Sequence, residues 1–142
     1  MFRFSLFAVS LLAISSPTLA QDAAKVEVVV HVPSKVDSFK DRQLEIRLYE
    51  FDPRIADKGA TLLDKHLDKS FTHDAGKDRL VVVTLGAKAK VDPKMRYYIT
   101  VFVLDAAGKR THIGEKDGKA GLCLVLTDRN PSKVTMIARP VR

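Results

Sequence analysis

Residues 92–110 read DPKMRYYITVFVLDAAGKR, and this stretch decides the fold class. Asp92-Pro93 interrupts any preceding regular element, because proline lacks a backbone N–H and has a fixed φ. Residues 96–104 are then almost all β-branched or aromatic, which is typical of a strand. Asp105-Ala-Ala-Gly108 follows as a turn of the kind that joins antiparallel strands. Both alternating faces of this strand are largely apolar, so we expect a central strand covered on one face and at least partly covered on the other.

Other segments of the chain share this strand-like pattern, with turn signals between them. They are residues 26–32, 43–50, 61–71, 80–85, 109–115, 122–127 and 133–141. Residues 61–71 also show helical spacing of apolar side chains, but the segment is short and has no clear cap, so we prefer a strand. Residues 34–42 are polar and indicate a loop that inserts Phe39 into the edge of the core. The pattern predicts an all-β fold, an antiparallel β-sandwich of about seven or eight strands.

The first twenty residues have the three parts of a secretory signal. Arg3 supplies the positive end, residues 4–14 are mostly apolar, and residues 15–20 are small and end at Ala20. The apolar run is shorter than the roughly 20 residues that a membrane span needs, and no later segment is long enough either. We expect cleavage after Ala20 and a single exported domain over residues 21–142, periplasmic or secreted. A retained amphipathic anchor is the alternative. No cysteine lies near the cut, so we expect no attached lipid.

The basic side chains outnumber the acidic ones, 24 to 17, and they come from many segments. No recognition helix or aromatic signature accompanies them, which argues against a nucleic-acid partner. An exported basic protein meets anionic surface polymers and lipid headgroups as its acidic partners. Charge spread in this way also serves solubility alone, and we prefer that interpretation.

The sequence contains no motif for catalysis. G-x-S-x-G, H-E-x-x-H and a glycine-rich phosphate loop are all absent, so we expect no enzyme activity and no cofactor. The single cysteine, Cys123, excludes an internal disulfide. It stands in the apolar run of residues 122–126, where we expect it to be a small buried hydrophobic residue.

The four histidines raise the possibility of a metal site. His31, His66, His73 and His112 lie in different segments, and no two are closer than seven positions. A zinc or copper site needs imidazoles that converge, and only His66 and His73 are placed to meet across a turn. We prefer solvent-facing histidines and expect no metal site, with a carrier of copper, zinc or a small ligand as the alternative function.

Three aromatic side chains point away from the predicted core. Tyr49, Tyr98 and Phe102 alternate with the apolar stripes of their strands. Left uncovered, they form an exposed aromatic patch of the kind that marks a binding surface. The alternative is that residues 54–59 lie across them.

The run Asp92-Pro-Lys-Met-Arg-Tyr97, followed by an alternating strand and Asp105-x-x-Gly108, resembles the YbaY-type lipoprotein family. That family is related to the lipoprotein chaperones of type III secretion, and the resemblance covers about residues 25–141. It implies an immunoglobulin-like or transthyretin-like sandwich in the cell envelope, which is non-enzymatic and binds or assists an envelope protein. It also implies that the Tyr97 hydroxyl ties the corner after Asp92-Pro93, as a tyrosine corner does in other sandwiches. The chain departs from the family in lacking the lipidation cysteine.

Overall fold

The structure is a computed structural model, and it describes residues 22–142. The expected signal sequence and its cleavage site lie outside the described residues. Within residues 22–142 there is no helix of the length and apolar character needed to cross a membrane.

The regular structure of the described residues consists of β-strands. They are β1 (Val26–Val32), β2 (Phe39–Phe51), β3 (Thr61–His73), β4 (Arg79–Leu85), β5 (Arg96–Leu104), β6 (Arg110–Lys116), β7 (Lys119–Ala120), β8 (Cys123–Val125) and β9 (Lys133–Pro140). The predicted all-β fold class is confirmed.

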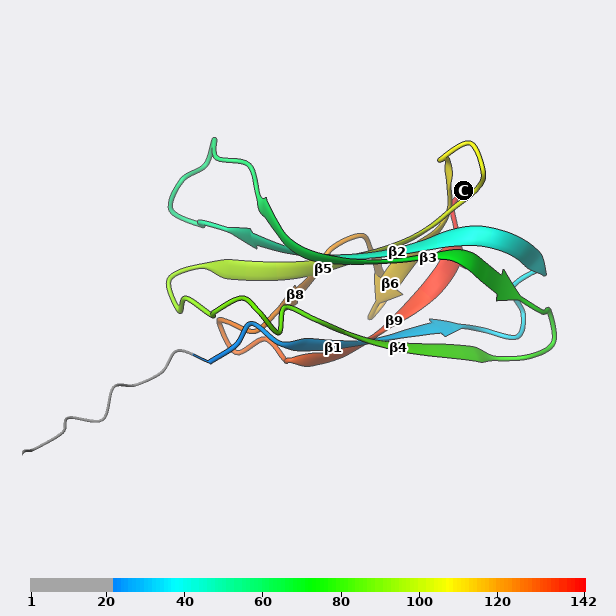
Figure 1. The fold of residues 1–142 in the computed structure, drawn as a ribbon, viewed down its shortest axis with the longest axis horizontal. Helices are drawn as coiled ribbons and strands as arrows, with labels where there is room; N and C mark the ends of the chain where they lie inside the picture. The colour runs from blue at the N-terminus through cyan, green and yellow to red at the C-terminus, as the bar shows by residue number, and fades with distance from the viewer. Residues whose placement is uncertain (1–21) are drawn as a thin grey trace, which may run out of the picture.

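The strands form one rolled sheet with two facing layers (Figure 1). The sheet order is β3-β2-β5-β6-β9-β1-β4, with β8 paired to β5 and β7 paired to β6. β3, β2 and β5 make one layer, β1 and β4 lie in the other, and β6 and β9 connect the two (Figure 1). One pair, β1 with β9, is parallel, so the sheet is not antiparallel throughout as we expected. Two strands at opposite ends of the chain meet there, and such a pair needs no hairpin.

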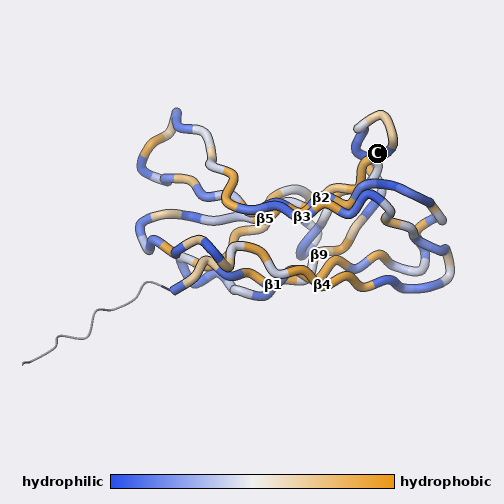
Figure 2. The backbone as a smooth tube through the Cα atoms, viewed as in Figure 1, coloured by the Kyte–Doolittle hydropathy of each residue, from blue (hydrophilic) through white to orange (hydrophobic). Residues whose placement is uncertain are grey.

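The hydrophobic core lies between the two layers. Alternate residues of β1 are fully buried, and the same alternation continues in β5 and β9. The strands carry most of the hydrophobic residues, and the loops at both ends are largely hydrophilic (Figure 2). The largest fully buried side chains are Tyr97, Phe71, Leu44, Ile46, Leu48, Ile99 and Met136.

The central strand β5 has the predicted bounds and the predicted inner face. Tyr97, Ile99, Val101 and Val103 are all buried, with Val101 only 1% exposed. The backbone N–H of Asp92 donates to the Tyr97 hydroxyl oxygen at 2.8 Å, so the expected tie at this corner is present. Burial of the phenol raises the pKa of Tyr97 to about 12, although the hydrogen bond from Asp92 acts in the opposite direction.

Strands β2 and β3 are longer than the sequence pattern predicted. The expected loop over residues 34–42 is wrong in its second half, because β2 begins at Phe39. Phe39 is opposite His73 in the ladder, and its ring centroid lies 5.6 Å from that of Phe71. The two strands therefore extend together until their aromatic side chains are buried.

The roll of the sheet closes without a ladder between its two edge strands, β3 and β4. The Asp64 carboxylate of β3 accepts the N–H of Gly86, which directly follows β4, at 2.9 Å. Arg79 of β4 donates to the carbonyl of Thr72 in β3. Gly86 has φ +79°, and a Cβ there would lie 1.9 Å from the carbonyl oxygen of Ala24. Side chains and one glycine thus join the two layers at this seam.

Candidate binding face

Four apolar side chains form a continuous row across the outer face of the layer that contains β5. Ladder partners project from the same side of a sheet, so the pairings place them side by side. Tyr49 of β2 is opposite Leu62 of β3 on one side and Tyr98 of β5 on the other. Tyr98 is in turn opposite Leu124 of β8. We call Leu62, Tyr49, Tyr98 and Leu124 the apolar row.

The two tyrosines at the centre of the row are stacked. Their ring centroids lie 5.0 Å apart with an interplanar angle of 22°. The ring of Phe51 lies 5.8 Å from that of Tyr98 and extends the aromatic cluster. Both tyrosines are half-buried, whereas Leu62 and Leu124 at the ends are 42% and 39% exposed.

A polar group beside the row holds Tyr49 in place. Arg47 donates to the Tyr49 hydroxyl at 3.1 Å and to the Glu45 carboxylate at 3.0 Å. Burial, followed by the neighbouring Tyr49, raises the pKa of the Tyr98 phenol. The Tyr98 phenol is therefore neutral at physiological pH.

The connection between β2 and β3 leaves the row open. It rises from one end of the layer (Figure 1), and residues 53–60 are exposed. Asp52 and Arg54 stiffen its start with an ion pair of 2.8 Å, and the hydrogen bonds from Arg54 lower the pKa of Asp52 to about 2. Leu62, which follows this connection, remains 42% exposed, so this end of the row is open to solvent.

Phe102 does not belong to the exposed surface. It points outward as predicted, opposite Ile113 and Glu45, but it is only 8% exposed. The guanidinium of Arg110 lies over its ring, 3.8 Å from the centroid. Because this cation covers the ring, Tyr49 and Tyr98 are the aromatic residues of the predicted patch that lie in the row.

The histidines are not placed as the sequence suggested. His73 and His112 are buried, with 1% and 6% of their surface exposed, so the expectation of solvent-facing histidines is wrong for both. They flank Phe39, whose ring lies 5.7 Å from His73 and 5.0 Å from His112. His66 and His73 share strand β3 and do not meet across a turn. His31 pairs with Asp78 at 3.0 Å.

No set of three or more potential metal ligands converges within residues 22–142. Cys123 is buried as expected, and burial raises the pKa of its thiol, which keeps the sulfur protonated.

Sequence reasoning missed the two leucines at the ends of the row. Leu124 belongs to the run of residues 122–126, whose alternation buries Cys123 and Val125 and exposes Leu122 and Leu124. That period of two was readable from the sequence. The outward orientation of Leu62 could not be predicted, because it depends on a register shift between Leu48 and Tyr49 in the β2–β3 ladder.

Three comparisons place this chain among known proteins. No family profile matches the chain, and no curated protein matches it. Among solved structures it is similar to an alternative pilotin from the type II secretion system of Vibrio cholerae, with a TM-score of 0.52 and 17% sequence identity. The likeness covers 83% of this chain and 96% of the pilotin chain. At this identity the comparison shows a pilotin-like fold, and it does not single out the YbaY-type family.

Proposed function

We propose that this protein is a non-catalytic binding or chaperone-like module of the cell envelope, exported after cleavage behind Ala20. Its apolar row binds a segment of an envelope protein. The observation that carries this proposal is the row itself, which crosses four hydrogen-bonded strands and has exposed leucines at both ends.

The row has the make-up of a small protein-binding site. Stacked aromatic side chains are rigid and give a large contact area at a low cost in conformational entropy. Strands lie about 4.8 Å apart, so four side chains in a row span about 14 Å. Charged side chains such as Lys65 and Arg47, which are ladder partners on β3 and β2, lie beside it and provide the polar rim that surrounds the apolar centre of an interface. This size suits a short apolar segment of a partner.

Two likenesses support an envelope partner. The fold is similar to that of a pilotin of a type II secretion system. The Asp92–Tyr97 motif resembles that of the YbaY-type lipoproteins, which are related to secretion chaperones. Both likenesses favour a role in assembly at a membrane over a catalytic role.

The mature protein is expected to begin at Gln21. N-terminal sequencing of protein recovered from the envelope checks this expectation.

The test is affinity capture from envelope extract with matched surface variants. The binding variant is Leu62→Ser/Leu124→Ser, which removes the two exposed ends of the row. The control is Leu80→Ser/Val82→Ser on β4, where the two side chains are 64% and 60% exposed on the other layer. All four side chains are already solvent-accessible, so both variants are expected to fold with little change in melting temperature.

The proposal predicts that one envelope protein is captured by the wild type and by the control and is lost with the binding variant. Equal capture by all three proteins contradicts the assignment of the face. If only the control variant fails to capture the envelope protein, the binding site lies on the β1–β4 layer.

A further inference from the structure

A positively charged hollow lies at the end of the molecule where the β5–β6 hairpin meets the end of β9. Its volume is about 460 Å³. Basic side chains dominate its charged lining. The basic members are Arg42, Lys109, Arg110 and Arg142, and the acidic members are Asp37 and Asp105. We call this site the basic hollow.

Two of its arginines are held in place by buried aromatic rings. The Arg42 guanidinium lies 4.9 Å from the ring centroid of Phe39, and that of Arg110 lies 3.8 Å from that of Phe102. The two rings are only 5% and 8% exposed, so they are fixed supports. A guanidinium held over a ring by cation–π attraction can still donate from its N–H groups to a ligand. Neither arginine takes part in an ion pair within residues 22–142.

The acidic side chains of the hollow offset only part of this positive charge. Asp105 uses its carboxylate to accept the N–H groups of Ala107 and Lys109, each at 2.9 Å, and so holds the hairpin turn. With Asp37 and Asp105 set against the four basic side chains, the lining keeps an excess of two positive charges.

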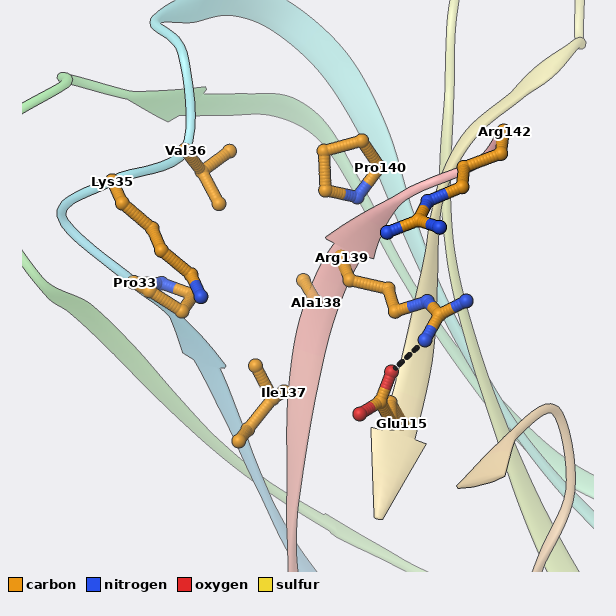
Figure 3. A pocket seen from close by; sticks show the side chains of 9 residues that line it. All are labelled: Pro33, Lys35, Val36, Glu115, Ile137, Ala138, Arg139, Pro140 and Arg142. Atoms are coloured by element: carbon orange, nitrogen blue, oxygen red, sulfur yellow. Dashed lines mark hydrogen bonds and ion pairs between the residues drawn. The ribbon is translucent and has the colours of Figure 1, made fainter. Parts of the chain in front are cut away.

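A second hollow adjoins the first and extends its charge. It has a volume of about 520 Å³, shares Pro140 and Arg142 with the basic hollow, and adds Lys35 and Arg139 (Figure 3). Arg139 pairs with Glu115 there, and Arg142 lies close to Arg139 (Figure 3). Together the two hollows have six basic and three acidic side chains. That excess of three is half of the excess of six carried by residues 22–142, so the positive charge is concentrated at this end.

We propose that the basic hollow binds a phosphate group through the basic side chains of its lining, among which Arg42 and Arg110 take part in no ion pair within residues 22–142. Phosphate oxygens match the planar donor fork of arginine, and such pairs are stronger than neutral hydrogen bonds. The phosphate belongs either to a lipid headgroup at a membrane surface or to a soluble phosphate ester. This site is separate from the apolar row and does not depend on the function proposed for it.

The experiment titrates the purified protein with inorganic pyrophosphate and, separately, with phosphatidylcholine vesicles that contain phosphatidylglycerol. NMR signals of the arginine side chains and the Thr111 amide report on the first titration, and co-sedimentation reports on the second. Arg42→Gln/Arg110→Gln is expected to weaken binding at least tenfold. Its control is Lys90→Gln/Lys94→Gln, which removes the same charge just before β5, at the end of that strand remote from the hollow. We expect the control to change binding less than twofold.

A third variant, Arg42→Lys/Arg110→Lys, keeps the charge and removes the planar fork. The proposal predicts that this variant weakens binding severalfold. If Arg42→Gln/Arg110→Gln lowers the melting temperature, the lysine variant replaces it as the test of the site. Saturable binding of pyrophosphate alone identifies a soluble phosphate ester, and binding of the vesicles alone identifies a lipid headgroup. If Arg42→Gln/Arg110→Gln and Lys90→Gln/Lys94→Gln lose binding equally, only net charge matters and the site is overturned. Absence of saturable binding to both probes overturns it as well.

Discussion

At the scale of single residues, three buried polar side chains, those of Tyr97, His73 and His112, each have a specific partner. The Tyr97 hydroxyl is buried at a chain reversal and accepts the N–H of Asp92. His73 Nε2 lies 3.1 Å from the carbonyl oxygen of Val36, and His112 Nδ1 lies 2.9 Å from the Thr111 hydroxyl. These contacts tie loops and strand ends to the core, which explains why polar groups are tolerated inside a small β-sandwich.

Tyr97→Phe tests the corner. The substitution keeps the ring and removes one hydrogen bond, so we expect a loss of about 1 kcal/mol in the free energy of unfolding, or about 2 kcal/mol if the Asp92 N–H finds no water. Urea denaturation measures the change. Tyr98→Phe is the matched control, because its ring is half-buried on the outer face, and it is expected to cost less. A larger loss for Tyr98→Phe would show that the roles of the two faces are exchanged.

His112 makes the stability of the fold depend on pH. Burial first, and then the charge of Arg42 and the neighbouring His73, lower the pKa of His112 from its ordinary value of 6.5. Between the two pKa values of His112, the unfolded chain is therefore protonated at this side chain and the folded chain is not. The stability contributed by the neutral imidazole is complete above pH 6.5 and declines as the pH falls through the lowered folded pKa.

We expect the free energy of unfolding to decrease between pH 7.5 and pH 5, by no more than about 1.4 kcal/mol per pH unit for this one proton. Urea denaturation at several pH values measures it. His112→Gln should show a shallower decrease than the wild type, because the other titrating groups are common to both proteins. Identical slopes in the two proteins would rule out the effect of His112.

At the scale of strands, the sequence predicted what depends on local alternation and missed what depends on pairing. The bounds of β1 and β5 were predictable because their inner residues repeat every second position. The lengths of β2 and β3 were not, since the polar segment before Phe39 becomes a strand only through its partner β3. The parallel pairing of β1 with β9 also depends on residues far apart in the chain. The aromatic half of the apolar row was predictable from alternation, whereas Leu62 needed the register of the ladder.

The seam between β3 and β4 gives a prediction at this scale. Asp64→Ala removes the acceptor of the buried Gly86 N–H, so we expect a loss of about 1 to 3 kcal/mol in the free energy of unfolding and faster hydrogen exchange of the Gly86 amide. Asp68→Ala is the control on the same strand, because the Asp68 carboxylate accepts only the nearby N–H of Ser70. Equal losses in both variants would show that the Asp64 contact does not hold the seam.

At the scale of the whole molecule, the two layers present different surfaces to possible partners. The outer face of β3, β2, β5 and β8 carries the apolar row, and the hairpin end carries the basic hollow. The other layer exposes Leu80 and Val82 on its edge strand β4. A protein that binds one partner through its row and a phosphate through its hollow could join that partner to a charged surface. The fold alone does not require this role, because similar sandwiches serve many functions.

The most direct test of the central claim is site-specific photo-crosslinking in living cells. A photoreactive phenylalanine analogue is placed at position 62 or 124, at the ends of the row, or at position 80 on the other layer as a control. We predict that positions 62 and 124 form a crosslink to the same envelope protein and that position 80 does not. Crosslinks from position 80 alone, or an absence of crosslinks from both positions of the row, would contradict the assignment of this face as the binding site.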